Sequence, residues 1–237
     1  MKADLHIHTN FSPDGISSPQ AIVNAAIEKG IQCICITDHG QIQGAVEVLK
    51  FSFDKNILVI PGIEILSRAG DILGINVKKI VPNGLSVKET VEEIKKQGGI
   101  AVVPHPFGWP AVASFWGSKN IICASNVHGV EVFNASVIFG FSNRRAFSFS
   151  QKNNLSFTAG SDAHLADFVG RGYIEIRDKV FSEKDVIEKI IAKQVEAKGT
   201  PLTIKELLRN GSKTNFNNVV RYYLVKIMRM FLQESKP

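Results

Sequence analysis

The stretch ADLHIHTNFSPDG, residues 3–15, decides the fold, because it joins an apolar strand directly to a run of polar residues. Its pattern predicts a buried strand over residues 3–7. Side chains alternate between the two faces of a strand, so His6 and His8 point the same way and can chelate one ion. The beginning of the chain therefore predicts a strand that ends at a metal site.

Apolar runs of the same kind recur along the chain and alternate with helical patterns. The predicted strands span residues 3–7, 31–37, 57–60, 100–103, 130–133, 155–159 and 173–176, and the predicted helices span 19–29, 43–51, 87–97, 143–152 and 186–193. Continuous apolar strands separated by amphipathic helices indicate parallel strands that are covered on their outer faces. Their number and even spacing favour an α/β fold of the barrel type.

Five of the six histidines follow an apolar strand directly, and they are His6, His8, His39, His105 and His164. Acidic residues obey the same rule, because Asp38, Glu64 and Asp162 also follow strands. In parallel α/β folds the carboxyl ends of the strands meet on one side, which carries the active site. Imidazole and carboxylate without thiolate suit Mn(II), Fe(II) or Zn(II) rather than a structural zinc. We expect a site this rich in ligands to hold more than one ion.

Five segments carry a resemblance to a known family, namely DLHIHTNFSPDG, CICITDHG, PGIEI, VVPHPFG and FTAGSDAH. In their order and spacing they resemble the PHP family, which is named for domains of bacterial DNA polymerases and histidinol phosphatases. The resemblance covers roughly residues 1–200. It implies a distorted (β/α)7 TIM-like barrel with metal ions at the carboxyl ends of the strands, and it implies hydrolysis of phosphate esters.

The resemblance also implies a ligand set for two or three divalent ions of Mn, Fe or Zn: His6, His8, Asp14, His39, Glu64, Asp71, His105, Asp162 and His164. Glu64 matches the carboxylate that bridges two metals in the family. Asp14 lies one residue further from His8 than in many members, because Pro13 adds a position. Asp71 stands where many relatives carry a histidine. A carboxylate there can still bind a hard ion, but it changes that ion's affinity or identity, so two or three ions both stay open.

Clustered divalent ions lower the pKa of a bridging water toward neutrality, which explains why no Ser, Cys or Lys nucleophile motif is needed. We therefore expect a hydrolase, a metal-dependent phosphoesterase that uses a metal-bridged hydroxide. Its expected substrate is a small phosphorylated metabolite, a nucleotide or the end of a short oligonucleotide. Two alternatives stay open: a non-catalytic binding or assembly module of the PHP type, and an amidohydrolase-type enzyme that hydrolyses a C–N bond.

Two arginines are candidates to bind the phosphate of the substrate, because a guanidinium binds phosphate through two hydrogen bonds. Arg171 lies in a loop between two glycines, seven residues beyond His164, and Arg68 lies four residues beyond Glu64. The segment after His105 carries the aromatic residues Phe107, Trp109 and Trp116, which either stack on a nucleobase or pack as a lid.

The net charge of +6 at pH 7 is unevenly distributed along the 237 residues. Residues 200–237 carry seven basic and two acidic side chains, so this tail holds +5 and the rest of the chain only +1. The three cysteines form no CxxC pair, which argues against a disulfide framework or a thiolate zinc site. No signal-peptide pattern or long apolar run occurs, so a cytoplasmic protein without a transmembrane segment is expected.

A Gly-Thr-Pro sequence at residues 199–201 marks the expected end of the barrel. It divides the chain into a metal-dependent phosphoesterase domain, residues 1–199, and a basic helical extension, residues 200–237. The extension is expected to form a short helix over 204–209 and a longer one over 219–233. The mixed apolar and basic faces of the longer helix predict packing on the barrel or on a partner subunit, with contact to an anionic membrane or RNA as the alternative.

Overall fold

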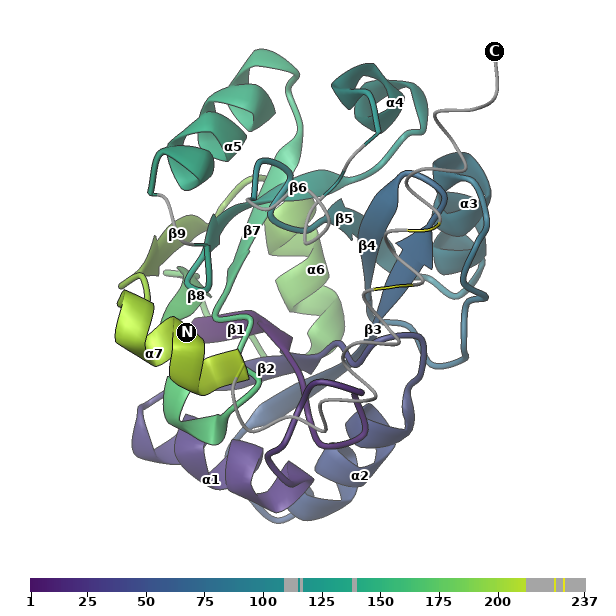
Figure 1. Ribbon diagram of the computed structural model, residues 1–237. Coiled ribbons are helices and arrows are strands. Elements are labelled where there is room, and N and C mark those ends of the chain that lie inside the picture. Colours follow the sequence, from purple (N-terminus) through teal and green to yellow (C-terminus); the bar gives the residue numbers. More distant parts are fainter. Residues whose placement is uncertain (109–114, 116, 138–139, 212–223, 225–227, 229–237) are drawn as a thin grey trace.

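The computed structural model describes residues 1–108, 115, 117–137, 140–211, 224 and 228. Within them a nine-stranded sheet curls into a nearly closed barrel with helices packed around it (Figure 1). The strands are β1 (Lys2–Ile7), β2 (Cys33–Ile36), β3 (Leu58–Ser67), β4 (Gly70–Ile75), β5 (Ile100–Val103), β6 (Gly129–Asn134), β7 (Ser156–Gly160), β8 (Gly172–Glu175) and β9 (Glu196–Gly199). The expected distorted TIM-like barrel is confirmed.

The sheet has the order β7-β6-β5-β4-β3-β2-β1-β8-β9. Strands β1, β2 and β3 are parallel to one another, and so are β5, β6 and β7. Strand β4 joins the two parallel sets and is antiparallel to both of its neighbours. Strands β8 and β9 extend the sheet beyond β1 in antiparallel pairing.

The helices are α1 (Pro19–Glu28), α2 (Gln43–Ser52), α3 (Val87–Lys96), α4 (Lys119–Ala124), α5 (Gly140–Lys152), α6 (Glu183–Ile191) and α7 (Ile204–Gly211), with a short 3-10 helix at Ala166–Phe168. Serine side chains cap the amino-terminal ends of α1, α3 and α6. Ser18 accepts a hydrogen bond from the Ala21 amide, and Ser86 and Ser182 each form a reciprocal capping box. These caps satisfy amide groups that the first helical turn leaves free.

Strand β2 shows how the sequence builds two apolar layers. Its side chains alternate, so Cys33 and Cys35 belong to the main core while Ile34 and Ile36 belong to a second cluster with residues of α1 and α2. All four side chains are completely buried. A strand that is buried on both faces must be apolar throughout, which is why CICI is a continuous apolar run.

Three elements were not predicted from the sequence. The strand predicted over 57–60 continues to Ser67, so Glu64 lies within β3 rather than after it, and β4 follows as the second arm of a hairpin. Helix α4 and the mostly polar strand β9 were also missed. The prediction of parallel strands is wrong for β8, which pairs with β1 in the antiparallel direction.

Helix α7 agrees with the short helix expected over 204–209. The longer helix expected over 219–233 lies outside the described residues, apart from Leu224 and Met228. Among the helices that the structure does describe, none has the length and apolar character needed to cross a membrane.

The barrel closes where the segment after β7 meets β1. The Asp162 amide donates a hydrogen bond to the His6 carbonyl at 2.8 Å, and the His8 amide donates one to the Ala163 carbonyl at 2.9 Å. Gly160 makes this approach possible, because a Cβ atom there would lie 2.3 Å from the Cβ of His6. The absence of a side chain at residue 160 therefore allows β7 to reach β1.

We expect Gly160→Ala to destabilise the protein by about 1–3 kcal/mol, because the added methyl group overpacks the junction of β1 and β7. The free energy of unfolding in urea measures the effect. Gly140→Ala is the matched control, since a Cβ atom at residue 140 would meet nothing within 4 Å. Equal stability of the two variants would contradict this account of the closure.

Candidate metal centre

The residues assigned to metal binding from the sequence lie around the ends of the parallel strands. They are His6 and His8 at the end of β1, Asp14 in the following loop, His39 after β2, Glu64 in β3, Asp71 in β4, His105 after β5, and Asp162 and His164 after β7. Three of them are half-buried, namely His39, Asp162 and His164, and the others are buried. Such a concentration of ionisable side chains is rarely buried unless the groups pair or bind metal.

Eight of these nine residues fall into three groups, in each of which the nitrogen and oxygen donor atoms lie within 4.8 Å of one another. The groups are His8, Asp14, His39 and His164; His6, Glu64 and His105; and His6, His8 and Asp162. Because His6 and His8 each belong to two groups, the three groups form one continuous cluster.

Glu64 lies at the centre of the cluster. Its Oε2 atom is 3.4 Å from Nε2 of His6, 3.3 Å from Nε2 of His8 and 3.2 Å from Nδ1 of His39. Its Oε1 atom is 3.8 Å from Nε2 of His105. A carboxylate with two oxygens directed to different histidines has the geometry that a bridge between two ions requires.

The chemistry of the donor set fits divalent ions. The Nε2 atoms of His6 and His8 lie only 3.1 Å apart, and two nitrogen lone pairs at that distance repel each other unless a proton or a cation lies between them. Nitrogen and carboxylate donors without thiolate suit Mn(II), Fe(II) or Zn(II).

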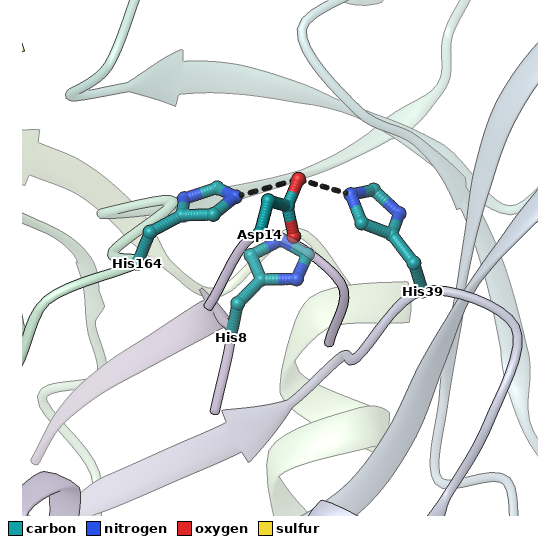
Figure 2. A group of neighbouring side chains, drawn as sticks. All are labelled: His8, Asp14, His39 and His164. Carbon is teal, nitrogen blue, oxygen red and sulfur yellow. Dashed lines mark hydrogen bonds and ion pairs between the residues drawn. The ribbon is translucent and has the colours of Figure 1, made fainter. Parts of the chain in front are cut away.

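Asp14 lies between two histidines that come from distant parts of the chain (Figure 2). Its Oδ2 atom is 3.1 Å from Nε2 of His39 and 3.2 Å from Nε2 of His164. The Ser12 hydroxyl donates to Oδ1 of Asp14 at 2.9 Å. The position added by Pro13 therefore leaves the carboxylate within reach of both histidines.

Opposite charges outweigh the cost of burial within this cluster. Burial lowers the pKa of His6, but the Asp162 and Glu131 carboxylates raise it to a value well above the ordinary one. Burial also opposes the charge on His8, yet hydrogen bonds with Asp162 and Glu64 raise its pKa to about 10. Despite burial, neighbouring histidines hold the pKa well below its usual range in the carboxyls of Asp14, Glu64 and Asp162. Divalent cations would replace the protons that these histidines share.

Glu131 is a residue of the centre that was not identified from the sequence. Its side chain is 1% exposed, and its Oε1 atom is 3.1 Å from Nδ1 of His6. Its Oε2 atom accepts hydrogen bonds from the His105 amide at 3.0 Å and from the Asn134 side-chain amide at 2.9 Å. A charged residue inside the apolar run Val130-Glu131-Val132 was the signal, because a buried carboxylate needs partners. Glu131 therefore orients the imidazole of His6 from behind.

Asn134, the last residue of β6, lies at the mouth of the barrel. Its side-chain amide donates to Asp162 Oδ2 at 3.2 Å as well as to Glu131. Asp38 accepts hydrogen bonds from the amide and the hydroxyl of Thr9, at 2.6 and 2.8 Å, and so fixes the segment that follows His8.

Asp71 lies outside the three groups. It pairs with Leu66 in the antiparallel ladder of β3 and β4, whereas Glu64 pairs with Leu73. Asp71 is therefore two residues away from the strand position opposite Glu64, which corresponds to about 7 Å along β4. Its assignment as a ligand stays a prediction.

The two candidate arginines make contacts with the protein itself. The Arg171 guanidinium is 3.1 Å from Glu206 Oε1 and donates to the carbonyls of Thr200 and Pro201. Arg68 is exposed and donates from Nε to the Gly84 carbonyl at 3.0 Å. Phosphate binding by Arg171 would require it to leave Glu206. Trp109 and Trp116, two of the aromatic residues noted after His105, lie outside the described residues.

Comparison with known sequences gives two kinds of match. A family model described as PHP-associated matches residues 140–195. An uncharacterised protein of Methanocaldococcus jannaschii is 41% identical over 145 residues, which cover 57% of this chain and 82% of that protein.

Solved structures give the same fold. A two-domain protein from Bacteroides vulgatus, described as containing a predicted PHP-like metal-dependent phosphoesterase, superposes with a TM-score of 0.72 at 24% identity and covers 90% of this chain and 69% of that one. The lesion-specific endonuclease Q from Pyrococcus furiosus superposes with a TM-score of 0.62 at 18% identity, over 83% of this chain and 57% of that one. Endonuclease Q has also been solved with a 27-mer duplex that carries an abasic lesion at its active site. At these identities the likeness concerns the fold alone.

We expect Glu131→Gln to weaken the binding of a divalent ion by about 10–100-fold. Two donors face Oε2, so the amide oxygen of glutamine must take that position and its NH2 must face His6. His6 then keeps its proton on Nε2, where a metal ion needs a lone pair. Competition with a chelating dye measures the affinity. Glu188→Gln, on the surface of α6, is the control, and an unchanged affinity in Glu131→Gln would refute the orienting role.

After removal of metal, the melting temperature should fall as the pH rises from about 6.5 to 9.5. The pKa of His8 is about 10 in the folded protein, above its ordinary value in the unfolded chain. Protonation of His8 therefore stabilises the folded protein fully below the unfolded-state pKa, and this stabilisation is lost as the pH rises toward 10. The lowered pKa values of Asp14, Glu64 and Asp162 matter only at acidic pH, where their stabilisation is lost. His8→Gln should show a smaller decrease. An identical pH profile in the variant and the parent would contradict the assignment.

Proposed function

This chain belongs to the PHP family, and we propose that it is a metal-dependent phosphoesterase that hydrolyses phosphate esters. One observation carries the proposal: three adjoining groups of histidine and carboxylate donors share members at the mouth of one barrel. A barrel that served only as a binding or assembly module would not require so many buried ionisable groups, because their burial is costly without an ion or a reaction that uses them.

The residues that would hold two or three ions are the three donor groups, with Glu64 bridging between them and Asp71 as a further candidate. Bound there, divalent ions of Mn, Fe or Zn would supply a hydroxide nucleophile near neutral pH and would neutralise the charge of the phosphoryl oxygens. The surrounding residues keep the donors in position. Glu131 holds the Nδ1 side of His6, and Asp38 holds Thr9 beside His8.

Asp14 and His39 are the candidates to move a proton to the leaving group. Oδ2 of Asp14 is 3.1 Å from Nε2 of His39 at the exposed side of the cluster, so whichever of the two side chains holds no ion can carry a proton to the leaving group. Both side chains remain slightly accessible, at 6% and 8% exposure, and their neighbour His164 is 17% exposed, whereas His6 is completely buried. This difference supports a position next to the substrate for the side of the cluster that includes Asp14, His39 and His164.

The proposed substrates are a small phosphorylated metabolite, a nucleotide or the end of an oligonucleotide. The fold likeness to endonuclease Q, whose complex contains a DNA duplex, supports including nucleic acid among them. An amidohydrolase-type reaction is the second candidate by fold class, because barrels with histidine-bound metals also hydrolyse C–N bonds. No observation on the described residues favours it over phosphate ester hydrolysis.

Metal analysis combined with a hydrolysis screen tests the proposal. Protein reconstituted with Mn(II) should bind at least one ion per chain and should hydrolyse one or more of p-nitrophenyl phosphate, bis(p-nitrophenyl) phosphate, nucleoside phosphates and 5′-phosphorylated oligonucleotides. Glu64→Gln and Asp162→Asn should each lower kcat by at least about a hundredfold, because each removes a charged donor from the centre.

Glu188→Gln is the control variant, and p-nitroacetanilide reports hydrolysis of a C–N bond. Fewer than one ion per chain after reconstitution would overturn the proposal. Full activity in both donor variants would show that the reaction takes place elsewhere, and cleavage of the anilide alone would favour the amidohydrolase alternative.

A further inference from the structure

Two cations meet one aromatic ring just beyond the metal centre. The Lys119 ammonium is 5.4 Å from the ring centroid of Phe107, and the Arg145 guanidinium carbon is 4.7 Å from the same centroid. Phe107 lies two residues beyond His105, so its Cα atom is at most about 8 Å from that of a predicted metal ligand. We call Phe107, Lys119 and Arg145 the cation–aromatic cluster.

The cluster lies at the same end of the barrel as the metal centre. Phe107 follows the carboxyl end of β5, Lys119 begins α4, and Arg145 lies in the second turn of α5, after the carboxyl end of β6. In a barrel of parallel strands, the segments that follow the strands line the functional face. The cluster therefore borders the mouth that a substrate would enter.

The positive charge of the cluster is unmatched within the described part of the chain. No carboxylate there lies within 4.0 Å of the charged nitrogens of Lys119 or Arg145, and Lys119 donates only to the Phe115 carbonyl, at 2.5 Å. By contrast, Arg171 contacts Glu206 and Arg177 contacts Glu196. Two neighbouring cations without a carboxylate form a site that an anion would complete.

The arrangement is costly to the protein without an anion. Lys119 is half-buried, and its burial, together with the neighbouring Arg145 charge, lowers the pKa of its ammonium to about 8. The Phe107 ring offsets part of this cost, because the face of an aromatic ring attracts cations. A doubly charged phosphate would offset more of it through hydrogen bonds that are assisted by charge.

We propose that Lys119 and Arg145 bind a second phosphate group of the substrate, away from the phosphate that is hydrolysed. The inference rests on the proposed function and deepens it by naming the substrate class, a phosphate ester that carries a second phosphate group. The two cations match the two charges of a phosphate monoester. The guanidinium offers paired donors, and the ammonium offers a point charge.

The test uses two sets of matched probes with Mn-loaded protein: alkyl phosphates, and alkanediol bisphosphates with spacers of four to eight carbons. Wild-type protein should show a higher kcat/KM for at least one bisphosphate than for the matching monophosphate. Lys119→Met and Arg145→Gln should each remove about tenfold of that preference and leave kcat/KM for the monophosphate unchanged within about twofold.

Arg144→Gln is the matched control, because it removes the same charge from an exposed position next to Arg145. Arg145 is itself exposed, so its substitution tests the proposal even where Lys119→Met folds poorly. Equal losses of kcat/KM for the monophosphate and the bisphosphate would overturn the proposal. So would a preference for the bisphosphate that is unchanged in Arg145→Gln, or the absence of that preference in the wild-type protein.

Calorimetric binding separates failure of this inference from failure of the proposed function. If neither probe is hydrolysed, the phosphoesterase proposal fails, while the affinity for the bisphosphate still reports on the cluster. An affinity about tenfold weaker in Arg145→Gln than in Arg144→Gln would support the second phosphate site. Equal affinities in these two variants would overturn it.

Discussion

The contact between β1 and the segment after β7 is the constraint on which the candidate centre depends. Two backbone hydrogen bonds, from Asp162 to His6 and from His8 to Ala163, interleave the ends of segments that are about 155 residues apart in the chain. The same bonds place four donor side chains in register, because His6 and His8 alternate with Ile7 as Asp162 and His164 alternate with Ala163. Closure of the barrel and assembly of the donors are therefore one event.

Buried carboxylates outside the three donor groups keep this junction in place. Asp4 is completely buried and accepts hydrogen bonds from the amides of Ser161, at 2.9 Å, and Gly170, at 2.7 Å. Burial raises its pKa to about 6 even though several donors oppose that shift. Glu131 and Asp38 act in the same way on His6 and Thr9. The centre is thus surrounded by acceptors that fix backbone and imidazole groups, an arrangement that preorganises a site for ions.

The charge around the mouth depends on which cations form ion pairs in the fold, and not on how close each cation lies to a metal-binding residue in the sequence. Arg171 is only seven residues beyond His164, yet its guanidinium contacts Glu206 of α7. Lys119 and Arg145 are distant from every donor in the sequence, yet both contact Phe107, which follows His105 closely. A net charge of +6 therefore says little about the substrate until each cation is matched with its neighbours.

Much of this molecule could be predicted from the sequence, because strand ends in a parallel barrel converge whatever the details of packing. The alternation of His6 with His8, and the placement of His39, His105, Asp162 and His164 after apolar strands, anticipated six of the donors that the fold brings together, and the family resemblance added Asp14 and the bridging role of Glu64. The antiparallel β4, the partners of Glu131 and the pairing of Arg171 with Glu206 were decided only by the tertiary structure. The physical reason is the distance along the chain over which each property is determined. Side-chain alternation and strand ends depend on neighbouring residues, whereas hydrogen bonds and ion pairs between distant segments exist only once the barrel has closed.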